Sequence, residues 1–155
     1  MYPYILALIV VLLDQITKLI VVALLKPIFT QDIIHGVLSF KYTENIGVAF
    51  GLFGGGRIFF IISTLIIIIA IGIFIEKFKY DNLAFTLILT LVLGGAAGNL
   101  IDRIHYGYVV DFVYVHFLPY IFNIADCFLI IGAILISAYL VFFEKELELI
   151  SRHGK

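Results

Sequence analysis

The chain has 155 residues, of which 63% are hydrophobic and 14% are charged, and its mean hydropathy is +1.18. A soluble domain is about half apolar and about a quarter charged, and a short chain buries only about two-thirds of its surface. The apolar excess therefore excludes an ordinary soluble protein and indicates that lipid is the solvent for much of the chain. The net charge of −1 gives no sign of a nucleic-acid partner.

Four stretches are long and apolar enough to cross a bilayer, which takes about 20 residues of helix. They are approximately Tyr4–Leu25, Ile58–Ile75, Leu83–Ile101 and Ile124–Phe143. We therefore predict an all-α membrane protein with four transmembrane helices, in which residues 1–155 form a single integral-membrane domain.

The segments that join the spans predict how the chain lies in the membrane. Residues 76–82 and 144–155 share one side and hold five basic residues in 19 positions. Residues 26–57 and 102–123 share the other side and hold four in 54. Since basic residues concentrate in cytoplasmic segments, we expect both termini in the cytoplasm and the two longer segments on the outer side.

The first outer segment is expected to contain a small set of β-strands. Val37–Thr43 alternates loosely between apolar and polar residues, and glycines that favour tight turns follow it. The second outer segment, Ile104–Asn123, is rich in aromatic and β-branched residues. We expect it to lie at the membrane interface, with its tyrosines as an aromatic belt.

Polar residues within the spans carry the functional signal, because a charged side chain there costs at least about 2.5 kcal/mol. Asp14 and Lys18 are four residues apart on one helix face, where they can form an ion pair. This pair either ties helices together or contacts the substrate. In the third span, Gly94 and Gly98 allow another helix to approach closely, and Asn99 lies deep enough to need a polar partner.

Two further aspartates, Asp111 and Asp126, lie in apolar surroundings 15 residues apart on the same predicted side. One interpretation is that Asp111 is an interfacial carboxylate facing water and that Asp126 caps a helix, although Asn123 already offers a cap. The other interpretation is a functional pair. Two close carboxylates cannot both ionise, so one keeps a proton while the other accepts one from an attacking water. Such a pair cleaves a peptide bond without a metal or a covalent intermediate.

Other chemistries fit the sequence less well. The four histidines are scattered and form no metal-binding motif, so neither a metal nor a cofactor is expected. No GxSxG motif and no phosphate-binding glycine loop is present. Cys127, the only cysteine, is interpreted as a small buried hydrophobic residue. A serine–histidine arrangement stays open, because spacing alone does not exclude one for Ser39, Ser63, Ser137 or Ser151.

Five sequence strings, in this order, resemble the lipoprotein signal peptidase (signal peptidase II) family. They are DQITK (Asp14–Lys18), ENIGVAFG (Glu44–Gly51), GGAAGNLIDR (Gly94–Arg103), GYVVDF (Gly107–Phe112) and FNIAD (Phe122–Asp126). Each string alone is a weak signal. Five in order, within four spans, make a specific match that covers nearly the whole chain.

The resemblance implies an aspartyl peptidase of the bacterial inner membrane, with its active site near the outer face. Such enzymes remove the signal peptide from prolipoproteins and cut before a cysteine that carries diacylglycerol. The implied catalytic pair is Asp111 and Asp126. The supporting or substrate-binding residues are expected to be Asp14, Lys18, Asn45, Asn99, Asp102, Arg103 and Asn123. The expected partners are lipid-modified prolipoproteins and membrane lipid, and the expected state is a monomer.

A transporter and a structural protein are the two alternatives to a peptidase. A small ion- or proton-coupled transporter or channel subunit would use intramembrane acids such as Asp14 and Asp102 as a relay. Against it, the carboxylates gather near one predicted surface and do not line a path across the membrane. A structural or assembly protein held together by Gly94 and Gly98 would not need two aspartates in apolar surroundings.

Overall fold

A computed structural model describes residues 2–47, 56–79 and 82–142 of the chain. Its helices are α1 (Tyr2–Leu24), α2 (Gly56–Phe78), α3 (Leu83–His105) and α4 (Ile124–Phe142). All four are long and apolar enough to cross a membrane, so the prediction of four long apolar helices is confirmed. Helix α3 extends four residues beyond its predicted end and includes Asp102 and Arg103. Phe143, the predicted end of the last span, lies outside the described residues.

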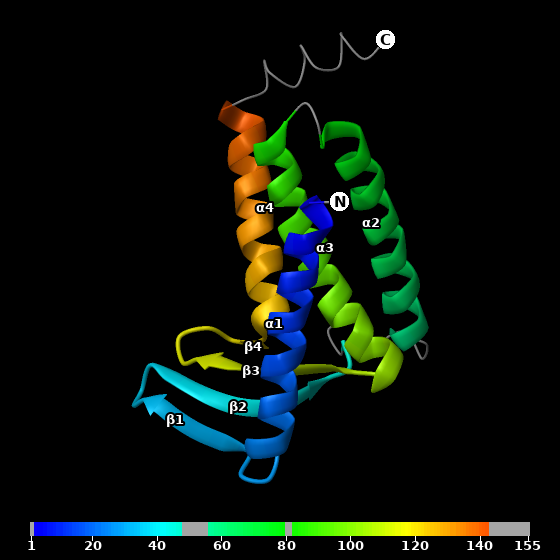
Figure 1. Cartoon of the computed structure of the whole chain (residues 1–155). Coiled ribbons are helices and arrows are strands. Elements are labelled where there is room, and N and C mark those ends of the chain that lie inside the picture. Colours follow the sequence, from blue (N-terminus) through cyan, green and yellow to red (C-terminus); the bar gives the residue numbers. More distant parts are fainter. Residues whose placement is uncertain (1, 48–55, 80–81, 143–155) are drawn as a thin grey trace.

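Helix α3 is the central helix of the bundle, and α1, α2 and α4 each pack against it (Figure 1). The apolar span of α3 is 61% buried, whereas that of α2 is 6% buried. Two glycines bring α1 close to α3. A Cβ atom on Gly94 would lie 2.6 Å from the Cβ of Val10, and one on Gly98 would lie 2.6 Å from Oδ2 of Asp14. The close helix approach predicted from this glycine pair is confirmed.

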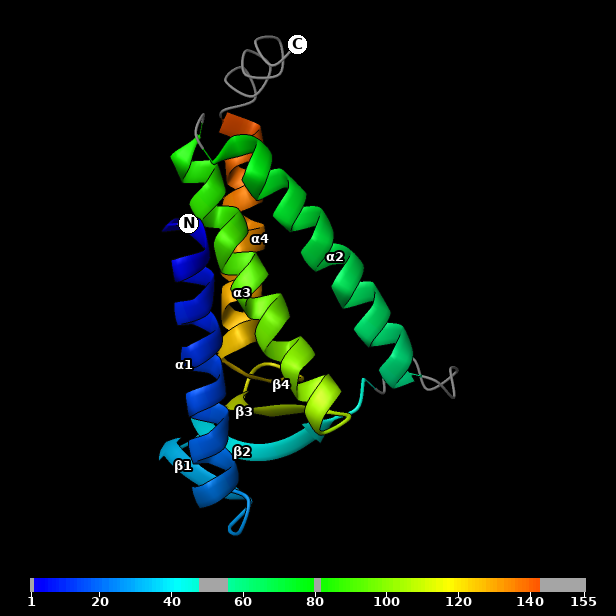
Figure 2. The same cartoon turned by 45° about the vertical axis from the view of Figure 1, so that its right-hand side comes forward.

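A four-stranded antiparallel sheet lies across one end of the bundle, and α1 continues alongside it (Figures 1 and 2). Its strands, in spatial order, are β1 (Thr30–Ile34), β2 (Leu38–Asn45), β3 (Val109–Val115) and β4 (Ile121–Phe122). We call this end of the bundle the sheet end. Helix α1 begins and α4 ends at the opposite end (Figure 1).

The sheet corrects the expectation of an all-α protein with strands in the first outer segment alone. The second outer segment supplies β3 and β4, and β3 pairs with β2 of the first segment. The sequence of β3 is VVDFVYV, in which β-branched and aromatic residues dominate. These residue types favour strands as well as membrane interfaces, so composition alone does not separate the two.

The two faces of the sheet have different surroundings. On one face Tyr42, Val110 and Phe112 pack against the end of α1. On the other face Asp111 and Tyr114 line a pocket. The β2–β3 register shifts between Phe40 and Thr43, where two residues of β2 lie opposite one residue of β3. The bulge therefore lies in β2, directly beside this pocket.

Candidate active site

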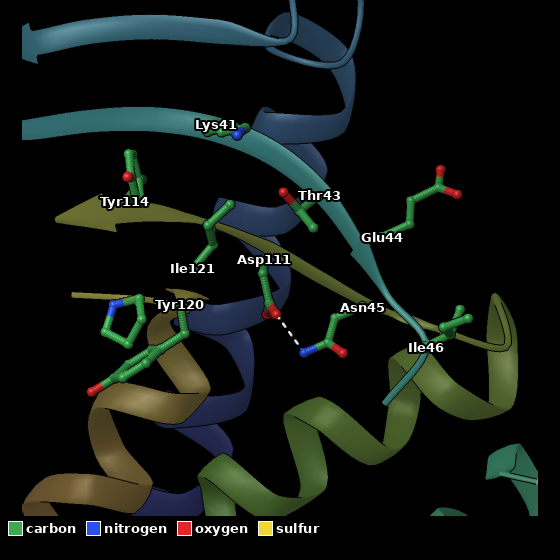
Figure 3. A pocket seen from close by; sticks show the side chains of 10 residues that line it. Lys41, Thr43, Glu44, Asn45, Ile46, Asp111, Tyr114, Tyr120 and Ile121 are labelled. Atoms are coloured by element: carbon green, nitrogen blue, oxygen red, sulfur yellow. Dashed lines mark hydrogen bonds between the residues drawn. The ribbon is translucent and has the colours of Figure 1, made fainter. Parts of the chain in front are cut away.

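Asp111 is held in the middle of β3 by two amide side chains. Its Oδ1 accepts a hydrogen bond from Nδ2 of Asn123 at 2.6 Å, and its Oδ2 accepts one from Nδ2 of Asn45 at 2.8 Å (Figure 3). The residue is 1% exposed. The interpretation of Asp111 as a loop carboxylate that faces water is therefore wrong.

Asp126 lies in the first turn of α4 and takes part in the cap of that helix. The backbone N–H of Asp126 donates to Oδ1 of Asn123 at 2.9 Å, and the backbone N–H of Asn123 donates to Oδ2 of Asp126 at 3.2 Å. This is the reciprocal arrangement of a capping box. The remaining carboxylate oxygen, Oδ1, accepts a hydrogen bond from Nδ2 of Asn99 at 2.8 Å. The cap thus fixes this carboxylate beside Asn99.

Two asparagines connect the carboxylates of Asp111 and Asp126. Nδ2 of Asn123, which donates to Asp111, also lies 3.1 Å from Oδ1 of Asn99, whose own amide donates to Asp126. The structure therefore brings together four of the predicted site residues from β3, α3 and the start of α4. Among the strands, β2 adds a fifth, Asn45.

Burial and charge perturb the ionisation of Asp111. Its pKa is raised to about 6, first because burial disfavours the carboxylate, and also because of the negative charge of Asp126. The hydrogen bonds from Asn45 and Asn123 oppose this rise, because they stabilise the ionised form. Asp111 thus keeps its proton to a higher pH than an ordinary carboxyl group.

Lys18 is the centre of a buried charge network behind these carboxylates. Its Nζ lies 2.8 Å from Oδ2 of Asp14, 2.9 Å from Oδ2 of Asp102 and 3.0 Å from Oδ1 of Asn99. The ion pair predicted between Asp14 and Lys18 is confirmed. Gln15, which the predicted site set did not include, donates to Oδ1 of Asp102 at 3.0 Å. The network ties α1 to α3. The side-chain amide of Asn99 connects it to the carboxylates of Asp111 and Asp126.

The two acidic residues of this network each hold the backbone next to one of the paired aspartates. Oδ2 of Asp102 accepts a hydrogen bond from the backbone N–H of Val110 at 3.0 Å, one residue before Asp111. Oδ1 of Asp14 accepts one from the backbone N–H of Ala125 at 2.9 Å, one residue before Asp126. Since Lys18 pairs with both Asp14 and Asp102, one cation supports the backbone beside both Asp111 and Asp126.

Arg103 is placed differently from the other predicted site residues. Its Nη1 donates to the backbone carbonyl of Asn99 at 3.3 Å, and its guanidinium lies 5.2 Å from the ring centroid of Phe60. Arg103 therefore links α3 to α2 and supports the turn that presents Asn99.

Two adjacent pockets are each lined by one of the two carboxylates. One, of about 480 Å³, includes Asp111, and the other, of about 420 Å³, includes Asp126. The first is lined by the β2 and β3 side chains Lys41, Thr43, Glu44 and Tyr114, and the second by the apolar side chains Phe122, Leu129 and Ile130. Both share Asn45, Tyr120 and Ile121, so the pockets meet between the two carboxylates.

Most of these lining residues were not predicted from the sequence. Tyr114 and Tyr120 belong to the tyrosines that were interpreted as an aromatic belt, and the structure places both on the pocket that contains Asp111 (Figure 3). Their signal in the sequence was their density around Asp111. That signal does not separate a pocket wall from a membrane interface.

A serine–histidine contact does occur, at the outer end of the sheet. Oγ of Ser39 lies 2.7 Å from Nε2 of His116 and donates to Oδ1 of Asp32 at 2.6 Å. In a nucleophilic triad the carboxylate orients the histidine and the histidine accepts the serine proton. Here the serine hydroxyl donates its hydrogen bond to the carboxylate of Asp32 and not to the histidine, and Ser39 is 2% exposed. The cluster therefore links strands and is not arranged for nucleophilic attack.

The distribution of acidic residues disfavours an ion relay. Along the described parts of the four helices, Asp14, Asp102 and Asp126 form one connected group, and Glu76 lies at the opposite end beside Tyr4. No acidic side chain of the described helices lies between that group and Glu76. A proton path across the bundle would need intermediate groups at these depths.

Comparisons with known proteins agree with this arrangement. The family model for signal peptidase (SPase) II matches residues 6–142. The lipoprotein signal peptidase of Halothermothrix orenii is 43% identical over 142 residues, which are 92% of this chain and 97% of the relative. That of Caldanaerobacter subterraneus subsp. tengcongensis is 40% identical over 133 residues, which are 86% of this chain and 91% of the relative.

A solved structure described as a bacterial membrane enzyme has the same fold. It superimposes with a TM-score of 0.83 at 37% sequence identity, over 92% of this chain and 94% of the solved one. The family match spans most of the chain, and the relatives align over nearly their whole length. A multi-pass membrane protein with this fold and these relatives belongs to the signal peptidase II family.

Proposed function

We propose that the protein is an aspartyl endopeptidase that removes the signal peptide from diacylglyceryl-modified prolipoproteins, cutting before the lipidated cysteine. The observation that carries this proposal is the linked pair of carboxylates, Asp111 and Asp126, at the junction of two pockets. The names of the relatives supply the substrate class. Residues 1–155 act as one peptidase domain in this proposal.

The raised pKa of Asp111 suits it to be the protonated member of the pair, and Asp126 then acts as the base. Asp126 accepts a proton from a water molecule as the water oxygen attacks the scissile carbonyl carbon. Asp111 donates its proton to the carbonyl oxygen. When the tetrahedral intermediate collapses, Asp126 gives its proton to the leaving amine of the cysteine. Asp111 takes back the proton that it had given to the carbonyl oxygen.

The remaining predicted residues position this pair. Asn45, Asn99 and Asn123 orient the carboxylates, while Lys18 with its two acidic partners fixes the backbone beside them. Asn99 also receives support from Arg103. No step in this mechanism uses a metal or a cofactor.

The test is cleavage of a purified, diacylglyceryl-modified prolipoprotein by the purified protein in detergent. We expect a single cut before the lipidated cysteine, an unmodified precursor to be cleaved poorly, and no loss of rate with a chelator. A rate lost to the chelator and restored by zinc would overturn the aspartyl mechanism. A cut at another bond would overturn the proposed site of cleavage.

We also propose that both termini are cytoplasmic and that the sheet end faces outward. Replacing Cys127 with alanine gives a background in which single cysteines report the side. A cysteine at His35, whose side chain is 99% exposed in the turn after β1, should react with an impermeant thiol reagent added to intact cells. A cysteine at Lys77, in the last turn of α2, should react only after the membrane is opened. The reverse pattern would overturn the orientation.

Replacing Asn45 with alanine should shift the pH dependence of cleavage. The Asn45 amide stabilises the ionised form of Asp111, so its removal raises the pKa of Asp111 further. The protonated form then persists to higher pH, and the alkaline limb of kcat/KM should move upward by about one pH unit, since a hydrogen bond to a charged group contributes about 1.5 kcal/mol.

The control for Asn45→Ala is Ser63→Ala, in α2, whose hydroxyl contacts the backbone of its own helix. It should leave both limbs of the profile in place. An alkaline limb that does not move in Asn45→Ala, or that moves to lower pH, would contradict the role given to the amide.

A further inference from the structure

Lys41 is a cation on the wall of the pocket that contains Asp111. It lies in β2, and its Nζ is 5.7 Å from the ring centroid of Tyr114, in the range of a cation–π contact (Figure 3). The side chain is exposed, and the ring of Tyr114 holds its charge at the pocket. The protein thus presents an ammonium group where a substrate would lie.

The charge of Lys41 is not neutralised by the described residues. At the sheet end, Lys18 pairs with Asp14 and Asp102, and Lys26 pairs with Glu44, but no ion pair of Lys41 occurs among the described parts of the chain. Glu44 is the other exposed charged residue on the pocket wall. Its Oε1 is 3.0 Å from Lys26 Nζ and also accepts a hydrogen bond from Tyr42.

The contrast between the two pockets indicates which part of a substrate passes Lys41. This step rests on the proposed function. The pocket at Asp126 is walled by Phe122, Leu129 and Ile130, at the start of a helix that spans the membrane. It suits the apolar parts of a lipidated precursor. The pocket at Asp111 runs onto the polar face of the sheet and suits the mature segment, which leaves the membrane.

The strand register sets the distance from the cleaved bond. Thr43 pairs with Asp111, and Lys41 lies two residues further along β2. Two residues of a regular strand span about 7 Å, and because the register shifts between Phe40 and Thr43, Lys41 lies at most about that far along β2 from Thr43. A substrate that runs along β2 therefore presents its second or third mature residue to Lys41.

We propose that Lys41 is a specificity-determining residue, which favours prolipoproteins with an acidic side chain at the second or third position of the mature segment. An exposed ion pair of this kind contributes up to about 1 kcal/mol, or about a fivefold preference in kcat/KM at low salt. The preference should weaken as salt is added, because the pair is solvent-accessible.

The experiment compares two sets of three diacylglyceryl-modified precursors, which differ only in having Asp, Asn or Lys at the second mature position in one set and at the third in the other. The wild-type chain should cleave the Asp substrate about threefold to fivefold faster, in kcat/KM, than the Asn substrate, and the Lys substrate more slowly still. Lys41→Glu should reverse this order, and Lys41→Gln should remove it. Lys77→Glu, at the opposite end of the bundle, should leave the wild-type order unchanged.

Each outcome separates this inference from the proposed function. Equal preferences in the wild type and in Lys41→Glu, with all substrates cleaved, would overturn the role of Lys41 and leave the peptidase intact. A preference that follows a charge placed before the scissile bond would also overturn it, because the direction of the substrate would be reversed. If the wild type cleaves none of the substrates, the proposed function itself fails.

Discussion

Asp111→Asn and Asp126→Asn should each lower kcat for prolipoprotein cleavage by at least about a thousandfold, because an amide neither accepts the proton of water nor returns one. Both variants should remain folded. An asparagine keeps the shape of the carboxylate, and at position 126 its oxygen can still accept the hydrogen bond from the N–H of Asn123. The matched control is Asp32→Asn, which removes an exposed carboxylate of the same sheet and should retain activity.

The double variant tests whether the two aspartates share one proton. If they act as a unit, Asp111→Asn combined with Asp126→Asn should be little worse than either single change, because the effects of coupled catalytic residues are not additive. Losses that multiply in the double variant would mean two independent roles.

The dependence of kcat/KM on pH is a second test of the same pair of carboxylates. The pKa of Asp111 is raised to about 6, so kcat/KM should fall as the pH rises through this region and the proton of Asp111 is lost. The active form holds one proton between the two carboxylates, so the profile should be bell-shaped and governed by the pair as a unit. A rate that keeps rising above pH 8 would contradict a protonated Asp111 in the active form.

Features set by local sequence were predictable, whereas features set by strand register were not. The apolar stretches predicted the helices, and the four-residue spacing of Asp14 and Lys18 predicted their ion pair, because neighbours on a helix face meet whatever the rest of the fold does. The second half of the sheet was missed, since VVDFVYV suits an interface as well as a strand. Ser39 and His116, which are 77 residues apart, meet only because β2 and β3 pair.

The candidate site was predictable in part. Asp111 and Asp126 stood out in the sequence because each is a carboxylate in apolar surroundings. Their proximity depends on the β3–β4 hairpin, whose turn folds the chain back toward α4, and sequence spacing alone does not specify such a turn. Resemblance to a family supplied that link. The anchoring of the backbone at Val110 and Ala125 could not be expected from either source.

That anchoring makes Lys18→Met the largest expected loss of stability. Lys18 is 3% exposed, and its removal leaves the carboxylates of Asp14 and Asp102 buried without their counter-ion. Removing one partner of a buried ion pair costs about 3–5 kcal/mol. For a chain of this size the thermal midpoint in detergent should fall by about 10 °C.

Two variants separate charge from packing at this position. Lys77→Met removes a lysine from the exposed end of α2 and should change the midpoint by less than about 2 °C. Adding Asp14→Asn and Asp102→Asn to Lys18→Met removes the uncompensated charges and should recover part of the loss. A Lys18→Met midpoint within 2 °C of wild type would mean that the two carboxylates are protonated or hydrated in the folded protein.

Activity should respond to Lys18→Met more steeply than stability does. Asp102 and Asp14 hold the N–H groups of Val110 and Ala125, so without Lys18 to fix these two carboxylates both catalytic candidates are positioned less tightly. A displacement of about an ångström in a reacting group can cost about a hundredfold in rate. We therefore expect kcat measured well below the thermal midpoint, where the variant is fully folded, to fall by about that factor. Full activity in a folded Lys18→Met variant would show that Asp14 and Asp102 position the pair without their shared cation.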